Sequence, residues 1–594
     1  AHARQREKTM KVKRLWLWAV AICGCAFVLP SFARTDDLSS LSQDSNQWVL
    51  PSLNYANTRY SKLDQINTDN AKDLKVAWTM STGALRGHEG QPLVVGDTLY
   101  FQSAYPNHVF AVDLDDYHTK WQYTPRQDEF AVAVACCDLV NRGVGYASGK
   151  IIEDALDGTI IALDAATGRV LWKAKNADPK LGQTVTSAPL IVHNKVIVGI
   201  SGGEFGVRGS LTAYDLNTGK RVWRAYSMGP DSDVLIGPSF KGPRNAGIST
   251  WRGDEWKLGG GTTWGWYSYD PNLNLLYYGT GNPGTWNPSQ RPGDNKWSMT
   301  IFARNPDTGQ AVWGYQMTPH DAWDYDGVNE MILANLTISP GDPTPALVHF
   351  DRNGFAYELD RRTGKLLLAK PYDPSVNWAT RIGSDGRPVV NPKYMTKAGV
   401  NVKNICPAAM GNKDEQPASY DEQTGMFIVP TNHNCMDYQA FTVKYKAGFP
   451  YVGATLLMYA GPGGYRGAVI AWDPTKGQIV WSDHERFPAW SGVLSTAGGV
   501  AFYGTMDGWF KAIDAKTGAL LYKFHVPSGV IGNPMTFMHG GKQYVAVLTG
   551  VGGWAAIGLA AGLNEPTAGL GAVNAAQDLK NYTNLGGTLM VFSL

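Results

Sequence analysis

One sequence pattern recurs along this 594-residue chain and constrains its fold more than any other feature. The pattern is Ala-x-Asp-x-x-Thr-Gly-x-x-x-Trp, and its best copies begin at Ala162 and Ala213. Weaker copies cover 111–121, 303–313, 471–481 and 512–522, another is anchored on Asp360, Thr363 and Gly364, and Trp78 closes a bare first copy. Self-similarity of this kind indicates an architecture built from one repeated unit.

Each copy predicts the same local structure. The Ala-x-Asp segment is expected in a strand, Asp-x-x-Thr-Gly in a tight turn, and the tryptophan at the end of the next strand. A single four-stranded sheet cannot bury both of its faces, whereas sheets stacked radially can. Eight copies therefore predict an all-β, eight-bladed β-propeller whose tryptophans dock between neighbouring blades. The long gaps at 223–313 and 368–481 are rich in Gly, Pro and Asn and predict inserted loops, without a second domain.

The first 33 residues are predicted to be removed from the working protein. A basic segment around Lys11 precedes an apolar run over 15–30, and a small-residue site ends at Ala33, as in a secretory signal peptide. Residues before Met10 are interpreted as an upstream extension. The run is short for a membrane span, with an uncleaved anchor as the alternative. Residues 34–594 are then expected to form one exported, periplasmic propeller domain without a membrane span.

The charge of the mature chain gives no reason to expect nucleic acid as a partner. Removing the leader takes six of the 53 basic residues and one of the 51 acidic residues, which leaves 47 and 50 and a net charge of −3. A nucleic-acid-binding domain would carry a basic excess.

Four cysteines remain after the leader: Cys136, Cys137, Cys406 and Cys435. An even number in an exported chain predicts two disulfides. Cys406 can pair with Cys435, which leaves the adjacent Cys136 and Cys137 to pair with each other. Such a ring strains the backbone, and strain tends to lie at functional sites. Two reduced, buried thiols are the alternative. There is no Cys-x-x-Cys-His motif, so no covalently attached c-type haem is expected.

Oxygen-bearing side chains outside the repeat are candidates for a site that binds a hard cation. Taken singly, each of them fits an ordinary turn or surface position better than a ligand position. The candidates are Glu204, which follows Ser201-Gly202-Gly203, Asn282, and the closely spaced Asp321, Asp324 and Asp326.

These candidates fall within motifs that occur in a fixed order along the chain. The motifs include Gly-His88-Glu89-Gly, Cys136-Cys137-x4-Arg142, Ser201-x-x-Glu204, Gly261-Thr262-Thr263-Trp264, Gly281-Asn282-Pro283, Trp323-Asp324-x-Asp326-Gly, Asp351-Arg352-Asn353-Gly, Pro430-Thr431-Asn432-His433, Trp490-Ser491-Gly492 and Gly552-Gly553-Trp554. With this set and order the chain resembles the methanol dehydrogenases that depend on pyrroloquinoline quinone (PQQ), over nearly all of its mature length. It is most similar to their lanthanide-dependent (XoxF-type) branch.

The resemblance implies that PQQ lies between the Cys136–Cys137 ring and the indole of Trp264. Trp264 falls outside the repeat register, and packing between blades is the alternative role for it. The matches for Glu89 and Thr186 are short, so a turn acid and a strand hydroxyl are alternatives there. The further residues implied to contact PQQ are Glu89, Arg142, Thr186, Ser201, Gly202, Gly203, Thr262, Arg352, Asn432 and Trp490.

The same resemblance implies that Glu204, Asn282, Asp324 and Asp326 ligate one metal ion. Calcium enzymes of the family typically carry Ala at the position of Asp326, whereas the lanthanide branch carries Asp. Three anionic side chains and a PQQ carboxylate would suit a trivalent lanthanide better than Ca²⁺. The alternative is a Ca²⁺ site with Asp326 turned outward.

The implied reaction is the oxidation of methanol or another small primary alcohol to the aldehyde. The metal would act as a Lewis acid, Asp324 as the general base, and Arg352 as the stabiliser of negative charge on the reduced quinone. A separate periplasmic c-type cytochrome is the implied electron acceptor, and a homodimer the implied assembly. Two alternatives are a PQQ enzyme for ethanol or larger alcohols, and a non-catalytic propeller scaffold, which would have no need of Cys136–Cys137 or Asp326.

Overall fold

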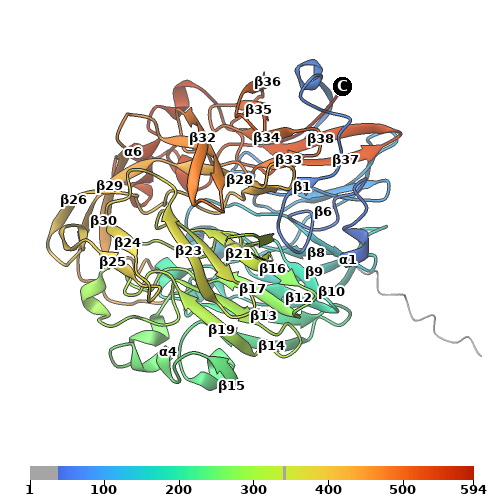
Figure 1. Cartoon of the computed structure of the whole chain (residues 1–594). Coiled ribbons are helices and arrows are strands. Elements are labelled where there is room, and N and C mark those ends of the chain that lie inside the picture. Colours follow the sequence, from blue (N-terminus) through green and yellow to red (C-terminus); the bar gives the residue numbers. More distant parts are fainter. Residues whose placement is uncertain (1–37, 339–340, 342) are drawn as a thin grey trace, which may run out of the picture. The chain divides into compact units, whose positions relative to one another are not determined.

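Short antiparallel strands make up almost all of the regular structure. The computed structural model describes residues 38–338, 341 and 343–594, so the predicted leader at 1–33 lies outside the described residues. The unit Asp36–Leu594 is compact and holds every described residue. Figure 1 shows its strands as a series of sheets that follow the order of the chain.

Eight sheets in the described ranges contain four antiparallel strands each, which agrees with the eight copies of the repeat. The first four are β3 (Leu93–Val95), β4 (Thr98–Gln102), β5 (Val109–Asp113) and β6 (Thr119–Tyr123); β7 (Gly145–Ala147), β8 (Lys150–Asp154), β9 (Thr159–Asp164) and β10 (Val170–Lys175); β11 (Leu190–Val192), β12 (Lys195–Val198), β13 (Ser210–Asp215) and β14 (Arg221–Tyr226); and β16 (Ser268–Asp270), β17 (Leu275–Gly279), β18 (Thr300–Arg304) and β19 (Ala311–Gln316). The other four are β20 (Ile332–Leu336), β21 (Thr344–Phe350), β22 (Phe355–Asp360) and β23 (Lys365–Pro371); β27 (Ser419–Asp421), β28 (Met426–Asn432), β31 (Gly467–Asp473) and β32 (Gln478–Glu485); β33 (Leu494–Thr496), β34 (Val500–Gly504), β35 (Trp509–Asp514) and β36 (Leu520–His525); and β37 (Met535–His539), β38 (Lys542–Thr549), β39 (Thr588–Ser593) and β2 (Lys75–Ser81).

The two ends of the described chain share sheets, which closes the propeller. Strand β2 pairs antiparallel with β39 and places Trp78 opposite Val591. Strand β1 (Tyr60–Ser61) adds to the preceding sheet by pairing parallel with β33. Figure 1 shows this blue N-terminal strand beside the red C-terminal ones. The join therefore pairs the first strands of the chain with the last ones, so neither end is left as a free sheet edge at this point.

The repeat tryptophans dock on the next sheet along the chain, as the repeat predicts. The indole nitrogen of Trp121 donates to the carbonyl of Ala165 at 2.9 Å, and Trp172 does the same to Leu216. Each indole also covers the glycine of the next Thr-Gly turn: a Cβ on Gly219 would lie 2.6 Å from the Trp172 ring. In the copy at 111–121 this glycine is replaced by Tyr117, whose φ of 64° keeps the turn and whose ring stacks on Trp78 at 4.9 Å.

The long gaps in the repeat contain added secondary structure as well as loops. Cys406 and Cys435 form a disulfide within the second insertion, as predicted. The additions include β15 (Ile236–Lys241), which pairs with β19; the hairpin of β24 (Ala379–Ile382) and β25 (Pro388–Val390); and the sheet of β26 (Asn401–Ile405), β29 (Asn434–Ala440) and β30 (Ala454–Ala460).

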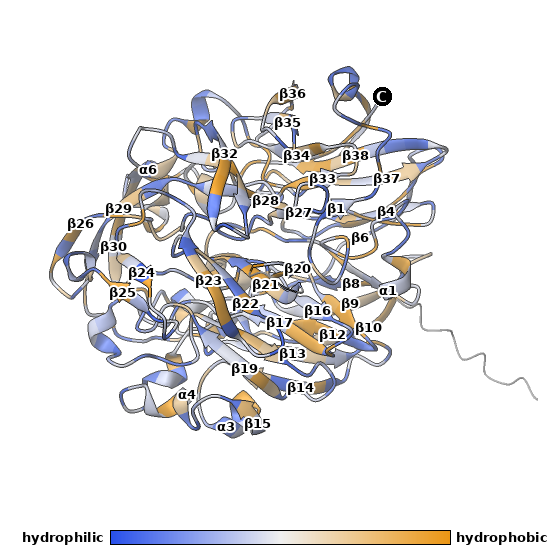
Figure 2. Cartoon of the chain, in the orientation of Figure 1, coloured by the Kyte–Doolittle hydropathy of each residue, from blue (hydrophilic) through white to orange (hydrophobic). Residues whose placement is uncertain are grey.

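The helices of the described residues are all short, and none is long and apolar enough to cross a membrane. They are α1 (Leu38–Leu41), α2 (Phe130–Val134), α3 (Asp231–Val234), α4 (Ala246–Ser249), α5 (Ile557–Ala561), α6 (Ala572–Ala575), and the 3-10 turns η1 (Ala71–Asp73), η2 (Pro179–Leu181), η3 (Gly203–Phe205), η4 (Glu255–Leu258), η5 (Pro288–Gln290), η6 (Pro392–Tyr394), η7 (Trp554–Ala556), η8 (Gly569–Gly571) and η9 (Leu579–Asn581). Figure 2 shows hydrophobic segments along many strands and hydrophilic residues in many connections.

Candidate active site

Strand direction places the predicted site residues at one end of the sheets. The Asp-x-x-Thr-Gly turns join the third strand of a sheet to the fourth, as in β9 to β10. Because the strands alternate in direction, connections from the second to the third strand, and from one sheet to the next, lie at the opposite end. The predicted site residues lie in those connections, apart from Asn432, which ends β28. The repeat turns and the candidate site thus occupy opposite ends.

These connections enclose a cavity of about 620 Å³, a volume that includes its opening to solvent. This size is within the range of sites for small cofactors. The predicted residues that line it are Glu89, Cys136, Cys137, Arg142, Thr186, Ser201, Gly202, Glu204, Trp264, Asp324, Asp326, Arg352 and Trp490. Others that line it are Val140, Thr184, Trp286, Asp414, Glu415 and Trp554.

The disulfide between Cys136 and Cys137 forms part of the cavity wall. Cys137 has a φ of 71° and Asp138 a φ of 85°, a left-handed backbone that costs free energy in residues with a side chain. The buried Asp138 carboxylate accepts hydrogen bonds from the backbone N–H of Gly553 at 3.0 Å and of Gly87 at 3.3 Å. The hydrogen bonds of Asp138 therefore join the disulfide segment to the segment that contains Trp554 and to the segment that contains Glu89.

Arg142 connects one side of the cavity into a single polar network. Its guanidinium pairs with Glu89 at 2.8 Å and with Glu415 at 3.2 Å, and it donates to the hydroxyl of Thr186 at 2.9 Å. The Thr186 hydroxyl lies 3.3 Å from that of Ser201. Burial raises the pKa of Glu89 to about 7 despite the charge of Arg142. The network presents both charge and hydrogen-bond donors to the cavity.

Carboxylates from separate connections converge on the other side. Asp326 accepts from the backbone N–H of Asn282 and, at 3.1 Å, from the indole of Trp264. A Cβ on Gly281 would lie 2.3 Å from the Asp326 carboxylate, so only glycine allows this approach. The Asn282 amide oxygen lies 3.1 Å from the place where a Cβ of Gly203 would be, beside Glu204. Glu204, Asn282 and Asp326 are therefore neighbours in space, and Asp326 faces the cavity.

Two oxygens of this cluster have no protein partner. Asn282 Oδ1 and Asp324 Oδ1 are buried and accept no hydrogen bond from the described residues. Asp324 also has a φ of 67°, the left-handed conformation, which is uncommon outside glycine and tends to occur at functional sites. Buried oxygens without donors are costly unless a ligand or water satisfies them.

The carboxylates that line the cavity outnumber the positively charged side chains beside them. Burial and the neighbouring Asp326 raise the pKa of Glu204 to about 7 and the pKa of Asp324 well above its usual range. Burial also raises the pKa of Asp326. Six carboxylates line the cavity beside two guanidinium groups. A cation placed among them would relieve this repulsion and hold the carboxylates ionised.

Arg352 is the second of these guanidinium groups. Its guanidinium donates to both carboxylate oxygens of Asp414, at 2.8 and 2.9 Å. It also lies 3.5 Å from the Asp324 carboxylate and 3.6 Å from the Asp326 carboxylate. Burial opposes its charge, but these three acids outweigh burial and raise its pKa. Its guanidinium also lies over the Trp264 ring, 5.4 Å from the centroid. Arg352 thus holds a permanent positive charge at the edge of the cavity.

A second hollow, lined mostly by apolar residues, adjoins the cavity and shares Cys136, Cys137, Glu204 and Trp554 with it. This hollow, here called the vestibule, has a volume of about 490 Å³. Its other lining residues are Phe205, Pro450, Val452, Ile557, Gly569 and Leu570. The vestibule offers an apolar approach to the charged cavity.

The sequence and the fold match those of known quinoproteins. The model of the glucose/ethanol/alcohol dehydrogenase β-propeller domain, the PQQ domain, matches residues 48–370 and 483–545. A lanthanide-dependent methanol dehydrogenase of Methylacidiphilum fumariolicum is 60% identical, over 99% of this chain and 100% of its own length. The chain belongs to the PQQ-dependent alcohol dehydrogenase family. The predicted resemblance and the predicted propeller are confirmed.

Two further quinoproteins support the same assignment. A solved europium-containing methanol dehydrogenase has a TM-score of 0.93 and 60% identity, and the match covers 94% of this chain and 100% of that one. Subunit 1 of a methanol dehydrogenase [cytochrome c] of Methylorubrum extorquens is 50% identical over 94% of this chain and 92% of its own length.

Four predicted residues of this quinoprotein do not line the cavity. Gly203, Thr262 and Asn282 lie directly behind it, since the Thr262 hydroxyl and the Asn282 amide lie 3.6 and 3.1 Å from a Cβ position on Gly203. The Asn432 amide donates to the carbonyl of Met410 and accepts from Gln416. Contact between Asn432 and PQQ stays a prediction.

Sequence reasoning missed Asp414 and Glu415. They lie in the run 413–416, Lys-Asp-Glu-Gln, which has the composition of a surface loop but is fully buried. Each charge in it meets an opposite charge: Lys413 pairs with Glu330, Asp414 with Arg352 and Glu415 with Arg142. No signal in the sequence identifies these partners. Trp554 belongs to the matched motif Gly552-Gly553-Trp554, but the sequence analysis predicts no role for it.

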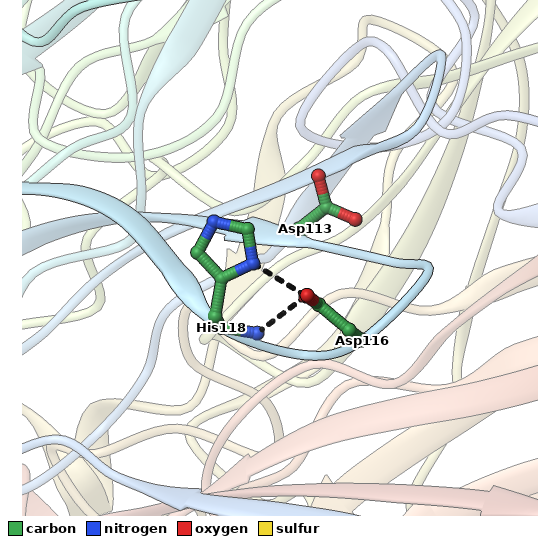
Figure 3. Close-up of side chains that lie close together, drawn as sticks. All are labelled: Asp113, Asp116 and His118. Atoms are coloured by element: carbon green, nitrogen blue, oxygen red, sulfur yellow. Dashed lines mark hydrogen bonds and ion pairs between the residues drawn. The ribbon is translucent and has the colours of Figure 1, made fainter.

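Outside the cavity, Asp113, Asp116 and His118 form a separate cluster. Their possible ligand atoms lie close enough together to hold a metal ion. The cluster lies in the repeat turn between β5 and β6, at the end of the sheets away from the cavity, and Figure 3 shows His118 bonded to Asp116. Asp113 pairs with Lys120 at 2.8 Å. These contacts shape a solvent-exposed turn, and Asp321 has a similar role in its own turn, where it accepts from the backbone of Trp323 and Tyr325.

Proposed function

We propose that this protein is a lanthanide-dependent methanol dehydrogenase that binds PQQ in the cavity and passes electrons to a c-type cytochrome. The observation that carries the proposal is the group Glu204, Asn282, Asp324 and Asp326 at one side of a cavity walled by a vicinal disulfide and Trp264. The relatives named for lanthanide-dependent activity and for cytochrome c support it. A scaffold protein would have no use for buried, unneutralised carboxylates.

The residues present fit both cofactors. Asn282 Oδ1 and Asp324 Oδ1 lack partners, and Glu204 and Asp326 add anionic oxygens, which is the donor set of a hard, highly charged cation. Trp264 supplies a flat aromatic surface, and Arg142, Thr186 and Ser201 supply donors for anionic rim groups. Glu89, Gly202 and Trp490 also line the cavity, and Gly203, Thr262 and Asn432 are proposed as further PQQ contacts. Asp326 lies inward, which favours a trivalent ion over Ca²⁺.

In the proposed reaction, residues of this chain have separate roles. When bound, PQQ accepts two electrons and the lanthanide acts as a Lewis acid. Asp324 accepts the hydroxyl proton of the alcohol as general base. Its two oxygens differ, since Oδ2 faces Arg352 and Oδ1 has no donor, so one oxygen can serve the metal and the other the proton. Arg352 stabilises negative charge that develops beside it. The apolar vestibule admits a small alcohol and excludes charged competitors.

Reconstitution tests the proposal. Purified protein with PQQ and La³⁺ is expected to oxidise methanol with a dye acceptor, less with Ca²⁺ and not without PQQ. Asp326→Ala is expected to lose the lanthanide-supported activity. No methanol oxidation with PQQ and La³⁺ together would contradict the proposal. The vestibule volume favours one second candidate, an enzyme for longer primary alcohols, and relative rates on methanol and butanol separate the two.

Location and assembly are part of the same proposal. Two disulfides agree with the oxidising conditions of the periplasm. A homodimer remains a prediction that light scattering in solution tests.

A further inference from the structure

We propose that an exposed patch of aromatic rings and lysines beside the vestibule is the docking surface for the electron acceptor, an acidic c-type cytochrome. The patch consists of Phe130, Leu181, Tyr445 and Phe449 with Lys180, Lys444 and Lys446. The inference rests on the proposed function and adds the place where electrons leave the protein.

The patch is formed mainly by the segment 441–450, which joins β29 to β30. This segment contains two lysines, three aromatic residues and no acid. Nearly all of it is exposed, with Phe449 at 50% and Tyr445 at 39%. Lys446 lies 3.8 Å from the centroid of the Phe449 ring, so charge and apolar surface alternate closely. Aromatic side chains with cationic neighbours are enriched at protein interfaces, and large rings in water are otherwise unfavourable.

Neighbouring elements extend the patch. A Cβ on Gly448 would lie 3.0 Å from the carbonyl of Lys180 and 3.5 Å from the Phe130 ring, so the segment packs on η2 and α2. Phe130 and Leu181 are 42% and 44% exposed at this junction. Exposed acids also lie at this junction: Asp128 accepts from the N–H of Phe130, Asp178 accepts from the N–H of Lys180, and Glu129 precedes Phe130. The cationic part of the patch is therefore the segment 441–450 itself, which carries Lys444 and Lys446 and no acid.

The patch is connected directly to the candidate site. The backbone N–H of Tyr451 donates to the carbonyl of Glu204 at 2.6 Å, immediately after the segment ends. Tyr445 lies against Gly206, at the end of η3, which contains Glu204. Pro450 and Val452 line the vestibule together with Cys136 and Cys137, and these cysteines also line the cavity. A partner on this patch would lie beside the apolar hollow that leads to the cofactor site.

The chemistry of the reaction defines the partner. Oxidation of one alcohol to the aldehyde releases two electrons and two protons; two acceptor proteins take one electron each, and both protons go to solvent. No haem-attachment motif is present in the sequence, so the electrons must cross to another protein. Lysines around an apolar centre attract a partner with an acidic rim, which raises the association rate and orients the complex.

The test compares a protein acceptor with a small one. Holoenzyme oxidises methanol with either an acidic bacterial c-type cytochrome or a phenazine dye, which needs no docking surface. We expect the K444E/K446E variant to raise the KM for the cytochrome about tenfold at low salt, with the effect shrinking as salt rises. F449S is expected to lower cytochrome turnover. Rates with the dye are expected to stay within about twofold of wild type. A change of that size is allowed because the patch lies next to the vestibule.

Matched controls lie at the other end of the sheets. K516E reverses an exposed charge, and L520S removes an apolar side chain that is also 50% exposed; both are expected to leave cytochrome kinetics unchanged. Unchanged cytochrome kinetics in the patch variants, or equal losses with dye and cytochrome, would overturn the inference. So would a lower molecular mass of the patch variants in light scattering, which would assign the patch to a second copy of this chain. Wild-type protein inactive with dye would instead refute the proposed function.

Discussion

At the scale of single residues, the candidate site depends on side chains in environments that a surface position would not offer. Asp324 has a left-handed backbone, complete burial and one oxygen without a donor. Asp138 lies behind the disulfide and accepts from two backbone N–H groups. In the proposed mechanism Asp324 acts on the substrate, whereas Asp138 positions the wall, so their variants should differ in what they change.

Asp324→Asn keeps an oxygen that can ligate a metal but removes the base. We expect kcat for methanol to fall by about 10²–10⁴, the usual contribution of a general base, while bound lanthanide stays near one per chain. Metal analysis alongside steady-state kinetics measures both. A near-normal kcat would exclude Asp324 as the base.

Asp138→Ala removes the acceptor for Gly87 and Gly553 and should loosen the disulfide wall. We expect weaker PQQ binding in a reconstitution titration, by about tenfold, which corresponds to one lost hydrogen bond to a charged group. Asp138→Asn retains an acceptor oxygen and is expected to restore most of the affinity. If both variants lose thermal stability but bind PQQ like wild type, Asp138 is only structural.

At the scale of elements, the repeat turn connects one sheet to the next. The tryptophan at the end of one sheet covers a glycine in the Thr-Gly turn of the following sheet and donates to a carbonyl there. The spacing of the repeat predicts that the tryptophan docks between neighbouring sheets, because turn and tryptophan recur at fixed offsets; the glycine and the carbonyl that it contacts come from the structure. The added sheet of β26, β29 and β30 was not predicted beyond "loop", since its pairings join segments that share no local pattern.

Gly219→Ala tests this docking against a matched control. Gly219 and Gly149 have φ values of 67° and 70°, so alanine costs the same backbone strain in both, about 1 kcal/mol. Only at Gly219 would the new Cβ meet an indole, at 2.6 Å, whereas Gly149 has open space. We expect Gly219→Ala to lower the free energy of unfolding by about 1–3 kcal/mol more than Gly149→Ala. Equal denaturation midpoints would contradict the docking role.

Glu358 in β22 makes stability depend on pH. Burial raises its pKa to about 8, above an unfolded value near 4.5, so the folded state holds the proton more tightly. The stability that this proton provides is complete below pH 4.5 and falls as pH rises toward 8, by at most roughly 1.4 kcal/mol per pH unit. Glu358→Gln should therefore melt above wild type at pH 8, with a much smaller difference at pH 5. A difference that is the same at both pH values would refute this.

At the scale of the whole molecule, the fold brings together residues that are far apart in sequence. Glu204 and Asp326 line the same cavity although more than a hundred residues separate them, because their connections emerge at the same end of different sheets. The cavity holds more negative than positive charge, so its occupant should stabilise the entire ring. Binding to the folded state alone raises stability by mass action.

Lanthanide should accordingly raise the melting temperature of the PQQ-loaded protein. A ligand at 100 times its Kd adds about 2.7 kcal/mol, which for a chain of this size is about 2 °C. Asp326→Ala should lose the shift for La³⁺, and Ca²⁺ should give a smaller one with wild type. Differential scanning fluorimetry measures these shifts. An identical La³⁺ shift in the variant would remove Asp326 from the site.

The sequence by itself determined the propeller, the tryptophan docking and most of the site. Local spacing encodes turns and strands, and the ordered motifs around Cys136, Glu204 and Asp324 carried the family resemblance. Only the tertiary structure decided which side chains face the cavity: it buried the charged run at 413–416 against Arg142 and Arg352. The reason is physical, since the burial of a charge depends on a partner that folding supplies from a distant part of the chain.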